Sequence, residues 1–355
     1  DPYGADRWMQ DVMEIGYSSL PTVNSEETWN LPAVMRTFND RQKNGWGVLD
    51  KYPKNNLLGP DYAFHQTTRP GIGSSLDSFG NLECSPPVTV NGKEYKFGRI
   101  VYGEGYGSNK MHKSVTDFLH AQLIQAPFSI DTGWLAVGHV DEIFSFCPMK
   151  NASKKFRVLS ASPDVAVNIL NDLKSSGDGD SKLFQSVRDA KYTAGRMEPQ
   201  SVYKFQTVNE ILDDSDFITH QGIVQDLIDA QKEIFKTELG LNDSDFVDLP
   251  VLFREYDGNG YIAYTAGVVN MLVVTYSGGA RLCIPKPFGP VVGGKCQFEE
   301  DIKFKLDPTG SSTTGLDYTF IDDFVTYHNG DGEIHCGTNS KRIASTDSWW
   351  WEQDV

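Results

Sequence analysis

The amino-acid sequence predicts an α/β protein, and two features of its pattern indicate this class. Strand-like runs keep alternating with runs of helical periodicity along the 355-residue chain. No long Pro/Ser-rich linker and no block of charges of one sign divides these runs into separate regions. Mixed order of this kind is typical of repeated strand and helix units rather than of an all-β sandwich.

The individual elements follow from local periodicity. Apolar-rich stretches predict strands at 97–103, 134–146, 156–162, 246–253, 261–276 and 318–328. The segment 114–125 places Val115 and Leu119 at helical spacing, and the segment 221–239 does the same with Leu227, Ile228 and Ile234. We therefore expect helices between the strands.

Composition excludes several classes of protein. Lys and Arg number 32 against 48 Asp and Glu, a net charge of -16, and 39% of the residues are hydrophobic. Such a composition describes a soluble globular chain whose acidic balance disfavours a nucleic-acid partner and suits cationic ligands. No stretch approaches the roughly 20 apolar residues that cross a bilayer, and the acidic start at Asp1–Asp6 lacks the pattern of a signal peptide, so we expect no membrane partner.

The cysteines provide the first candidate for chemistry. They number five, at positions 84, 147, 283, 296 and 336, without CxxC spacing, so they indicate neither a zinc site nor a complete disulfide framework. Cys336 lies in Gly332-Glu-Ile-His-Cys-Gly-Thr-Asn339, where a thiol ahead of a glycine can be activated by backbone N–H groups. The sequence leaves two interpretations open, a nucleophile and a buried structural cysteine.

A second candidate is the segment Gly138-His-Val-Asp-Glu142, which follows the apolar run Trp134–Val137. On a strand, His139 and Asp141 would point to the same face, so that an imidazole and a carboxylate share one pocket. Such a pair can bind a cation and move protons, whereas the structural alternative is a histidine paired with a carboxylate for packing.

A third candidate is the segment from Asp6 to Tyr17, in which Trp8, Gln10, Asp11 and Glu14 are interleaved with apolar residues. A carboxylate beside an aromatic ring suits a bound cation. A solvated turn before a strand is the alternative.

Together these segments resemble the protein-arginine deiminase family. The strings that carry the resemblance run in family order along almost the whole chain: Trp8-Met-Gln-Asp11, Gly71-Ile-Gly73, Leu76-Asp-Ser-Phe-Gly-Asn-Leu-Glu83, Ser85-Pro-Pro-Val-Thr-Val90, Gly138-His-Val-Asp-Glu142, Asn270-Met-Leu272, Ile284-Pro-Lys-Pro-Phe-Gly-Pro290, Phe324-Val-Thr-Tyr-His328 and His335-Cys-Gly-Thr-Asn339. The resemblance implies a pentein fold, a five-bladed α/β propeller of pseudo-repeated ββαβ modules. It also implies that residues 1–355 form a single catalytic domain, with no counterpart of the amino-terminal β-sandwich domains of the animal enzymes.

The resemblance implies an activity as well, the calcium-dependent hydrolysis of peptidyl-arginine to citrulline and ammonia. It assigns Cys336 as nucleophile, His139 as acid and base, Asp11 and Asp141 as clamps of the guanidinium, and Trp8 as a lining residue of the pocket. Its substrates would be proteins or peptides that contain arginine. A deiminase of free arginine or of another small guanidino compound, and a catalytically silent pentein that serves as a binding module, are the alternatives.

Calcium is the cofactor that the resemblance implies. Its ligands would be the side chains of Gln10, Glu14 and Glu83 and the carbonyl groups of Phe79 and Leu82, an all-oxygen set suited to a hard cation. The family's second calcium site is in doubt, because Val12 occupies a ligand position and the segment 24–30 departs from the family's Asp-Ser-Pro-Arg-Asn-Arg stretch. Loss of the arginine in that stretch implies altered recognition of the peptide backbone.

Overall fold

A computed structural model describes residues 3–21, 28–105, 107, 109–185, 187, 206–307 and 314–341. The chain divides into two compact units. Unit 1 comprises residues 1–133, 138–140 and 335–355, and unit 2 comprises residues 134–137 and 141–334. In the part of the chain that is described, every helix is too short or too polar to cross a lipid bilayer.

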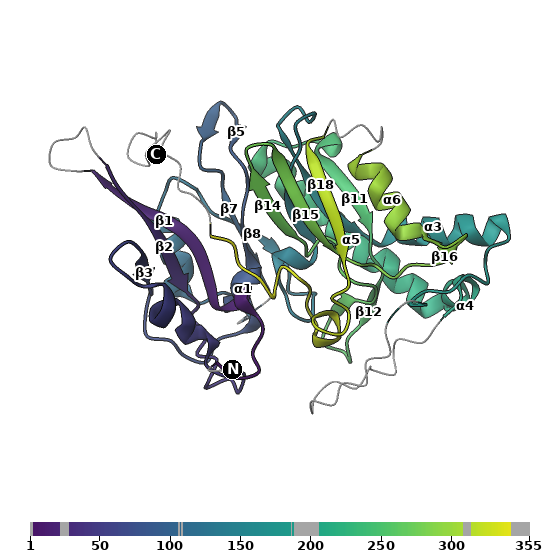
Figure 1. Ribbon diagram of the computed structural model, residues 1–355, viewed down its shortest axis with the longest axis horizontal. Coiled ribbons are helices and arrows are strands. Elements are labelled where there is room, and N and C mark those ends of the chain that lie inside the picture. Colours follow the sequence, from purple (N-terminus) through teal and green to yellow (C-terminus); the bar gives the residue numbers. More distant parts are fainter. Residues whose placement is uncertain are drawn as a thin grey trace. The chain divides into compact units, whose positions relative to one another are not determined.

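Unit 1 contains a long β-hairpin and the short helix that precedes it (Figure 1). Helix α1 (Met9–Val12) leads directly into β1 (Met13–Pro21), which pairs antiparallel with β2 (Thr28–Arg36). Strand β3 (Ala63–His65) adds to β2 in parallel. The register places Met13 opposite Arg36 at one end of the hairpin and Pro21 opposite Thr28 at the other.

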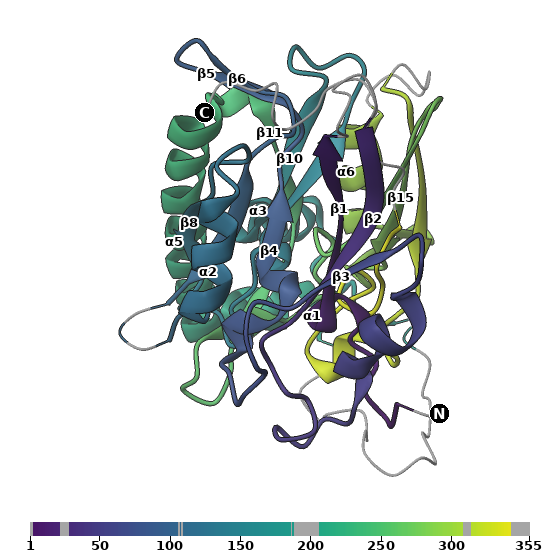
Figure 2. The same cartoon turned by 90° about the vertical axis from the view of Figure 1, so that its left-hand side faces the viewer.

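The second sheet of unit 1 has a helix packed against it (Figure 2). Strands β4 (Leu82–Cys84) and β7 (Ile100–Glu104) are antiparallel, and β8 (Phe128–Asp131) is parallel to β7. Helix α2 (Lys113–Ala121) connects β7 to β8 and buries Val115 and Leu119 against Ile100 and Tyr102. A small hairpin of β5 (Val88–Val90) and β6 (Lys93–Tyr95) lies between β4 and β7 in sequence.

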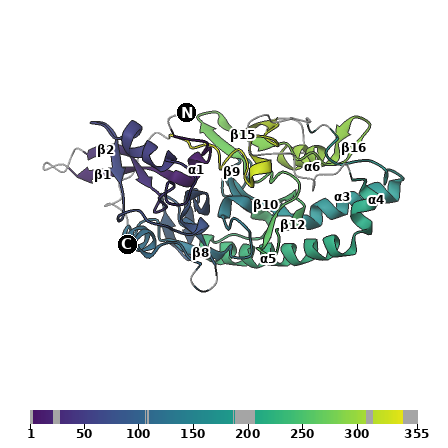
Figure 3. The same cartoon turned by 90° about the horizontal axis from the view of Figure 1, so that it is seen from below.

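Unit 2 contains two three-stranded sheets with helices (Figures 1 and 3). The first sheet has the order β11-β10-β9 and is formed by β9 (Phe144–Pro148), β10 (Phe156–Ser162) and β11 (Phe246–Pro250). Three helices connect β10 to β11: α3 (Pro163–Ser176), α4 (Val208–Asp213) and α5 (Ser215–Leu239). The other has the order β14-β15-β18, from β14 (Leu272–Tyr276), β15 (Gly279–Pro285) and β18 (Leu316–Ile321), with α6 (Gln297–Leu306) before β18. Two small hairpins complete the unit: β12 (Phe253–Glu255) with β13 (Tyr261–Ala263), and β16 (Val291–Val292) with β17 (Lys295–Cys296).

One connection pattern recurs in these sheets. In the β4-β7-β8, β9-β10-β11 and β14-β15-β18 sheets, an antiparallel pair is followed by a helical connection and a strand parallel to the second. The β1-β2-β3 sheet has the same strand directions. The α/β class predicted from the sequence is therefore confirmed, as a set of small mixed sheets.

Several of the predicted elements agree with the structure. The stretch 156–162 coincides with β10, and the predicted helices at 114–125 and 221–239 correspond to α2 and α5. Each of the stretches 246–253 and 261–276 was predicted as one strand but contains parts of two, and 318–328 ends in a 3-10 turn at His328–Gly330.

The predicted strand at 134–146 is wrong over most of its length. Only its last residues form a strand, β9, and Val140–Glu142 form a 3-10 turn. Residues 134–137 form a turn, an isolated bridge and bends, and Gly138 follows them with a φ of +90°, a conformation that glycine adopts without a steric penalty. His139 and Asp141 consequently do not share one face of a strand, contrary to the prediction.

Candidate active site

The amino-terminal segment of unit 1 carries a buried network of charges around Arg41. Its guanidinium donates from Nε and Nη2 to the two carboxylate oxygens of Asp6, at 2.8 and 3.0 Å. Its Nη1 lies 3.5 Å from Oδ2 of Asp11. Burial opposes the charge of Arg41, but its hydrogen bonds to Asp6 and the charge of Asp11 together raise the pKa of the guanidinium. Arg41 therefore links Asp11 to the rest of unit 1.

Trp8 and Asp11 are placed by the same segment. The backbone N–H of Trp8 donates to Oδ1 of Asp6, 3.2 Å away, immediately before α1 begins at Met9. The indole of Trp8 is buried, whereas the carboxylate of Asp11 remains partly accessible. Asp6 thus fixes both the start of the helix and the arginine that faces Asp11.

His139 lies next to Asp11 in unit 1, with Nδ1 3.9 Å from Oδ1 of that carboxylate. The imidazole is 1% exposed, and its Nε2 lies 3.0 Å from the carbonyl oxygen of Ser75. A carbonyl oxygen only accepts hydrogen bonds, so this contact assigns a proton to Nε2 and leaves Nδ1 as the nitrogen that gains or loses one. Gly138 permits the approach of this segment, since a Cβ there would lie 2.8 Å from a methyl group of Leu76.

Cys336 is held against the amino-terminal segment through its backbone. The N–H of Gln10 donates to the carbonyl of Cys336 at 3.0 Å. Three residues further on, Nδ2 of Asn339 donates to the carbonyl of Met13 at 2.9 Å. A turn in which Thr338 N–H donates to the carbonyl of His335 shapes the segment between these anchors. The chain around Cys336 is therefore fixed to the residues on both sides of Asp11.

Asp141, the remaining residue of the predicted catalytic set, belongs to unit 2. It lies in the 3-10 turn Val140–Glu142 and its side chain is buried. Unit 1 by itself brings together Trp8, Asp11, His139 and the backbone of Cys336.

Three of the predicted calcium ligands converge in unit 1. Nε2 of Gln10 donates to Oε2 of Glu14 at 2.9 Å and to the carbonyl of Phe79 at 3.2 Å. Leu82 donates its backbone N–H to the same carbonyl at the start of β4. The Glu14 carboxylate and the Phe79 carbonyl offer oxygen atoms as metal ligands, and Gln10 offers another once its amide turns Oε1 toward them. An all-oxygen set of this kind fits a hard cation. No three His, Cys, Asp or Glu side chains of the described residues gather in a metal-binding group, so a cation here would rely on carbonyl ligands.

The turn that carries Phe79 and Leu82 is fixed by Asn81. This buried side chain donates to the carbonyls of Leu76 and Gly103 and accepts from the N–H of Gly103. Glu83, the last predicted ligand, has Oε1 3.7 Å from Nε2 of His335. The predicted ligands thus lie on two segments of unit 1, residues 10–14 and 79–83.

The hairpin register bears on the second calcium site. Val12 is completely buried beside Met13 and Val34, so its side chain belongs to the core and offers no ligand. Residues 22–27, which include most of the segment compared with the family's Asp-Ser-Pro-Arg-Asn-Arg stretch, lie outside the described residues. The end of β2 nearest Asp11 instead carries Arg36, which pairs with Asp50.

Sequence reasoning missed Asp6, Arg41 and Ser75, since no local pattern relates them to Asp11 or His139.

All five cysteines lie in the described part of the chain, and none of them forms a disulfide bond there. Burial raises the pKa of Cys147 to about 12 and, with smaller contributions from neighbouring groups, that of Cys296 to about 11. These thiols are protonated near neutral pH and are unsuited to nucleophilic chemistry.

Comparison with known proteins agrees with the motifs. The family model described as "Protein-arginine deiminase (PAD)" matches residues 1–351. Human protein-arginine deiminase type-4 is 41% identical over 351 residues, which cover 97% of this chain and 48% of the relative. Human type-3 is 41% identical over 349 residues and human type-1 is 39% identical over 350 residues, with 97% of this chain covered in each case. The chain spans about half the length of the curated relatives it matches.

Proposed function

Since the chain belongs to the protein-arginine deiminase family, we propose that it hydrolyses the guanidinium of arginine residues in proteins or peptides, yielding citrulline and ammonia. The observation that carries the proposal is the arrangement in unit 1. There Asp11 lies beside His139, and the backbone of Cys336 is bound to the residue that precedes Asp11. The acidic balance of the chain also suits a cationic substrate.

The first half of the reaction forms a bond between sulfur and carbon. A guanidinium is planar and always protonated, so attack at its central carbon requires a soft nucleophile and carboxylates that fix the cation. The thiolate of Cys336 adds to this carbon while Asp11 and Asp141 hold the guanidinium nitrogens and Trp8 lines the pocket. The tetrahedral adduct then expels one nitrogen as ammonia, which takes its proton from His139.

The second half of the reaction regenerates the thiolate. Water attacks the carbon of the thiouronium left on Cys336 and passes a proton to His139, and the C–S bond breaks to release citrulline. The hydrogen bond between Nε2 of His139 and Ser75 supports this role, because it leaves Nδ1, beside Asp11, for both proton transfers.

We propose that the fold is a five-bladed pentein propeller formed by residues 1–355 as a single catalytic domain. The repeated pattern of an antiparallel pair, a helix and a parallel strand supports ββαβ modules.

Calcium is the proposed cofactor, with Gln10, Glu14, the Phe79 and Leu82 carbonyls, and Glu83 as the residues that would hold it. When bound, a divalent cation would compensate the charge of these carboxylates and hold the two ligand segments together. The contacts among Gln10, Glu14 and Phe79 support this site. Because Gln10 also donates its backbone N–H to Cys336, its position bears on the nucleophile.

The decisive experiment measures citrulline and ammonia from an N-acyl arginine amide and from free arginine, each with calcium and with a chelator. We expect turnover of the arginine amide with calcium and its loss on chelation. A preference for free arginine would instead identify a deiminase of a small guanidino compound. Peptide binding without turnover of either compound would identify a binding module.

Replacement of the nucleophile gives the first prediction. Cys336→Ala should abolish citrulline formation with the thermal unfolding transition retained, since a methyl group cannot add to the guanidinium. Cys147→Ala is the control, because that buried thiol has no assigned role in the reaction. Undiminished turnover in Cys336→Ala would disprove the assigned nucleophile.

A further inference from the structure

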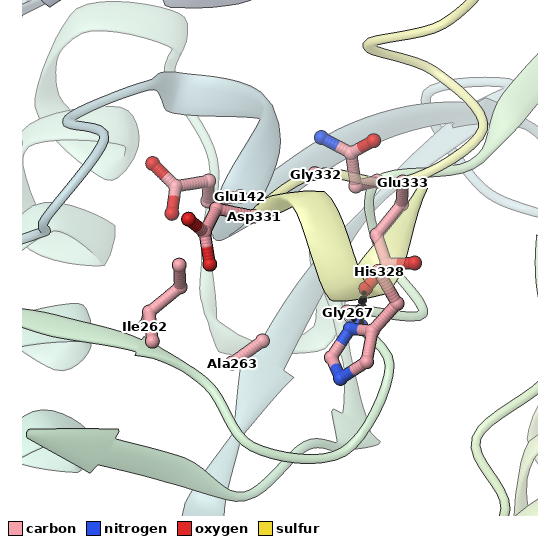
Figure 4. A pocket seen from close by; sticks show the side chains of 9 residues that line it. Glu142, Ile262, Ala263, Gly267, His328, Asp331, Gly332 and Glu333 are labelled. Atoms are coloured by element: carbon pink, nitrogen blue, oxygen red, sulfur yellow. Dashed lines mark hydrogen bonds and ion pairs between the residues drawn. The ribbon is translucent and has the colours of Figure 1, made fainter. Parts of the chain in front are cut away.

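A group of buried ionisable side chains in unit 2 has no role in the reaction as described above. Asp323, His328 and Glu333 are 2%, 4% and 4% exposed. All three lie between the end of β18 and Cys336, the proposed nucleophile, which follows Glu333 by three residues. His328 begins a 3-10 turn, and His328 and Glu333 line a cavity of about 20 Å³ (Figure 4).

His328 and Glu333 bind each other and the backbone of a neighbouring loop. Nδ1 of His328 lies 2.6 Å from Oε1 of Glu333, which also accepts from the N–H of Gly267 at 2.8 Å. Nε2 of His328 lies 3.3 Å from the carbonyl oxygen of Tyr264. Figure 4 shows the imidazole turned toward the carboxyl group, with Gly267 beside them.

These contacts determine where protons must be. Both ring nitrogens of His328 face oxygen atoms, and the Tyr264 carbonyl can only accept, so Nε2 carries a proton. One further proton must then lie between Nδ1 and Oε1 of Glu333. Burial lowers the pKa of His328 to about 4 and raises that of Glu333 to about 8, so this proton resides on the carboxyl group and both partners are neutral at pH 7.

Asp323 extends the proton network. Among the described residues, no N–H or hydroxyl group of another residue donates to either carboxyl oxygen of Asp323 or to Oε2 of Glu333. The two carboxyl groups instead act on each other's ionisation, through a contact that becomes a hydrogen bond only when one of them carries a proton. An ionised pair would leave buried charges without donors, and a proton between them satisfies both. Burial first, and the charge of Glu333 second, raise the pKa of Asp323 to about 9.

The surrounding groups do not compensate a second negative charge. Glu142 and Asp331 line the same cavity, and Oδ2 of Asp331 accepts from the hydroxyl of Tyr256 at 2.9 Å. Arg254 acts on His328 from a position where its guanidinium lies over the ring of Tyr256. Two carboxylates and one arginine thus face the cluster, so ionisation of both buried carboxyl groups is unfavourable.

We propose that Asp323 and Glu333 share a buried proton that fixes the chain segment from Asp323 to Glu333 and thereby positions Cys336. Both are positioning residues rather than catalytic residues, and this role rests on the proposed function. At alkaline pH the shared proton and the proton that Glu333 holds toward His328 are both lost, the two carboxylates repel each other, and the segment that leads to the nucleophile loosens. Turnover then falls without any change in the residues that touch the substrate.

Infrared spectroscopy of the whole protein tests the shared proton without requiring turnover. We expect a carboxylic-acid C=O band at pH 7 that shifts in D₂O and disappears in the double variant D323N/E333Q. The matched control Asp322→Asn removes an exposed aspartate beside Asp323 and should leave the band unchanged. Absence of the band from the unmodified protein, or its persistence in the double variant, would overturn the proposal.

The pH dependence of turnover tests the positioning role. An amide cannot ionise, so Asp323→Asn should move the alkaline decline of kcat upward by about one pH unit, with KM nearly unchanged. Asp322→Asn should keep the original profile. Identical profiles for the two variants would overturn the positioning role. If the unmodified protein shows no turnover, the proposed reaction and the positioning role both fail, while the infrared band still decides whether the proton is shared.

Discussion

Arg41 illustrates how a single buried residue can prepare the proposed site for a cationic substrate. Two of its nitrogens bind Asp6, and the third faces Asp11 at 3.5 Å. The bidentate pair with Asp6 already engages the charge of the buried guanidinium. Arg41 therefore compensates the charge of Asp11 only in part. A carboxylate in this state retains attraction for an incoming guanidinium while its orientation is already set.

Gly138 permits a prediction at the level of one residue. Alanine there must adopt a φ of +90° and place its Cβ 2.8 Å from Leu76, whereas Gly177 has a φ of +91° with open space around it. Gly177→Ala should lower the free energy of unfolding by about 1–2 kcal/mol through the backbone alone. Gly138→Ala should lower it further and reduce kcat as well, because His139 is the next residue.

Urea unfolding and steady-state kinetics of the two variants check this prediction. Equal losses of stability would show that Leu76 moves aside without cost. An unchanged kcat in Gly138→Ala would show that the position of His139 does not depend on this glycine.

At the level of elements, α5 shows how local signals define a long helix. Asp214 accepts from the N–H of Phe217 at its start, and Gly240 ends it with a φ of +62°. Val224, Ile228 and Phe235 are buried along one face. The helix therefore begins and ends where its sequence indicates, and its buried face combines these apolar residues with Gln221, Gln225, Gln231 and Lys232.

Two glycines of this helix should respond in opposite directions. Gly222 is exposed in the helix interior with open space around it, so Gly222→Ala should raise the free energy of unfolding by about 0.5–1 kcal/mol. Gly240→Ala should lower it by about 1 kcal/mol, because alanine is strained at a positive φ. Thermal or urea unfolding measures both, and a change of the same sign in the two variants would contradict the assigned helix boundary.

The segment between β18 and Cys336 gives a prediction for stability against pH. The folded pKa of Asp323 is raised from 3.8 to about 9, so between these values the folded protein binds a proton that the unfolded chain has lost. The free energy of unfolding contributed by this group therefore falls as pH rises. His328 acts in the opposite direction, but only between about 4 and 6.5.

Unfolding measurements from pH 7 to pH 9 isolate the effect of the carboxyl groups, because His328 is neutral throughout this window. The decline of stability with pH should be smaller in Asp323→Asn than in Asp322→Asn. Parallel declines in the two variants would contradict the raised pKa of Asp323.

At the level of the whole chain, net charge influences which substrates approach in the proposed reaction. A chain with a charge of -16 attracts basic peptides over a distance of about 10 Å at 0.1 M salt, and salt screens this attraction. We expect KM for an arginine peptide with flanking lysines to rise with NaCl concentration more steeply than KM for a peptide with flanking glutamates. Kinetics of the two peptides at several salt concentrations check this, and equal salt dependence would show that only local contacts select the substrate.

Prediction from the sequence succeeded for local features and failed where distant residues decide. The pattern of apolar residues identified α2, α5 and β10, because each element is long enough to show one, along one face of each helix and as a continuous run in β10. It failed at 134–146, where turns and bends precede Gly138 with its positive φ and a 3-10 turn follows it. The contact of Asp11 with Arg41 and that of His139 with Ser75 join residues 30 and 64 positions apart, which no local period encodes.

The sequence by itself determined the α/β class, the family, and the identity of the residues assigned to the chemistry, because periodicity and motifs are written in the order of side chains. Only the tertiary structure decided which charges meet and which protons are retained. It brought Asp6 and Asp11 to Arg41, and it enclosed Asp323 and Glu333 with His328. The physical reason is that ionisation depends on burial and on neighbours in space, and both are set by contacts between segments far apart in the chain.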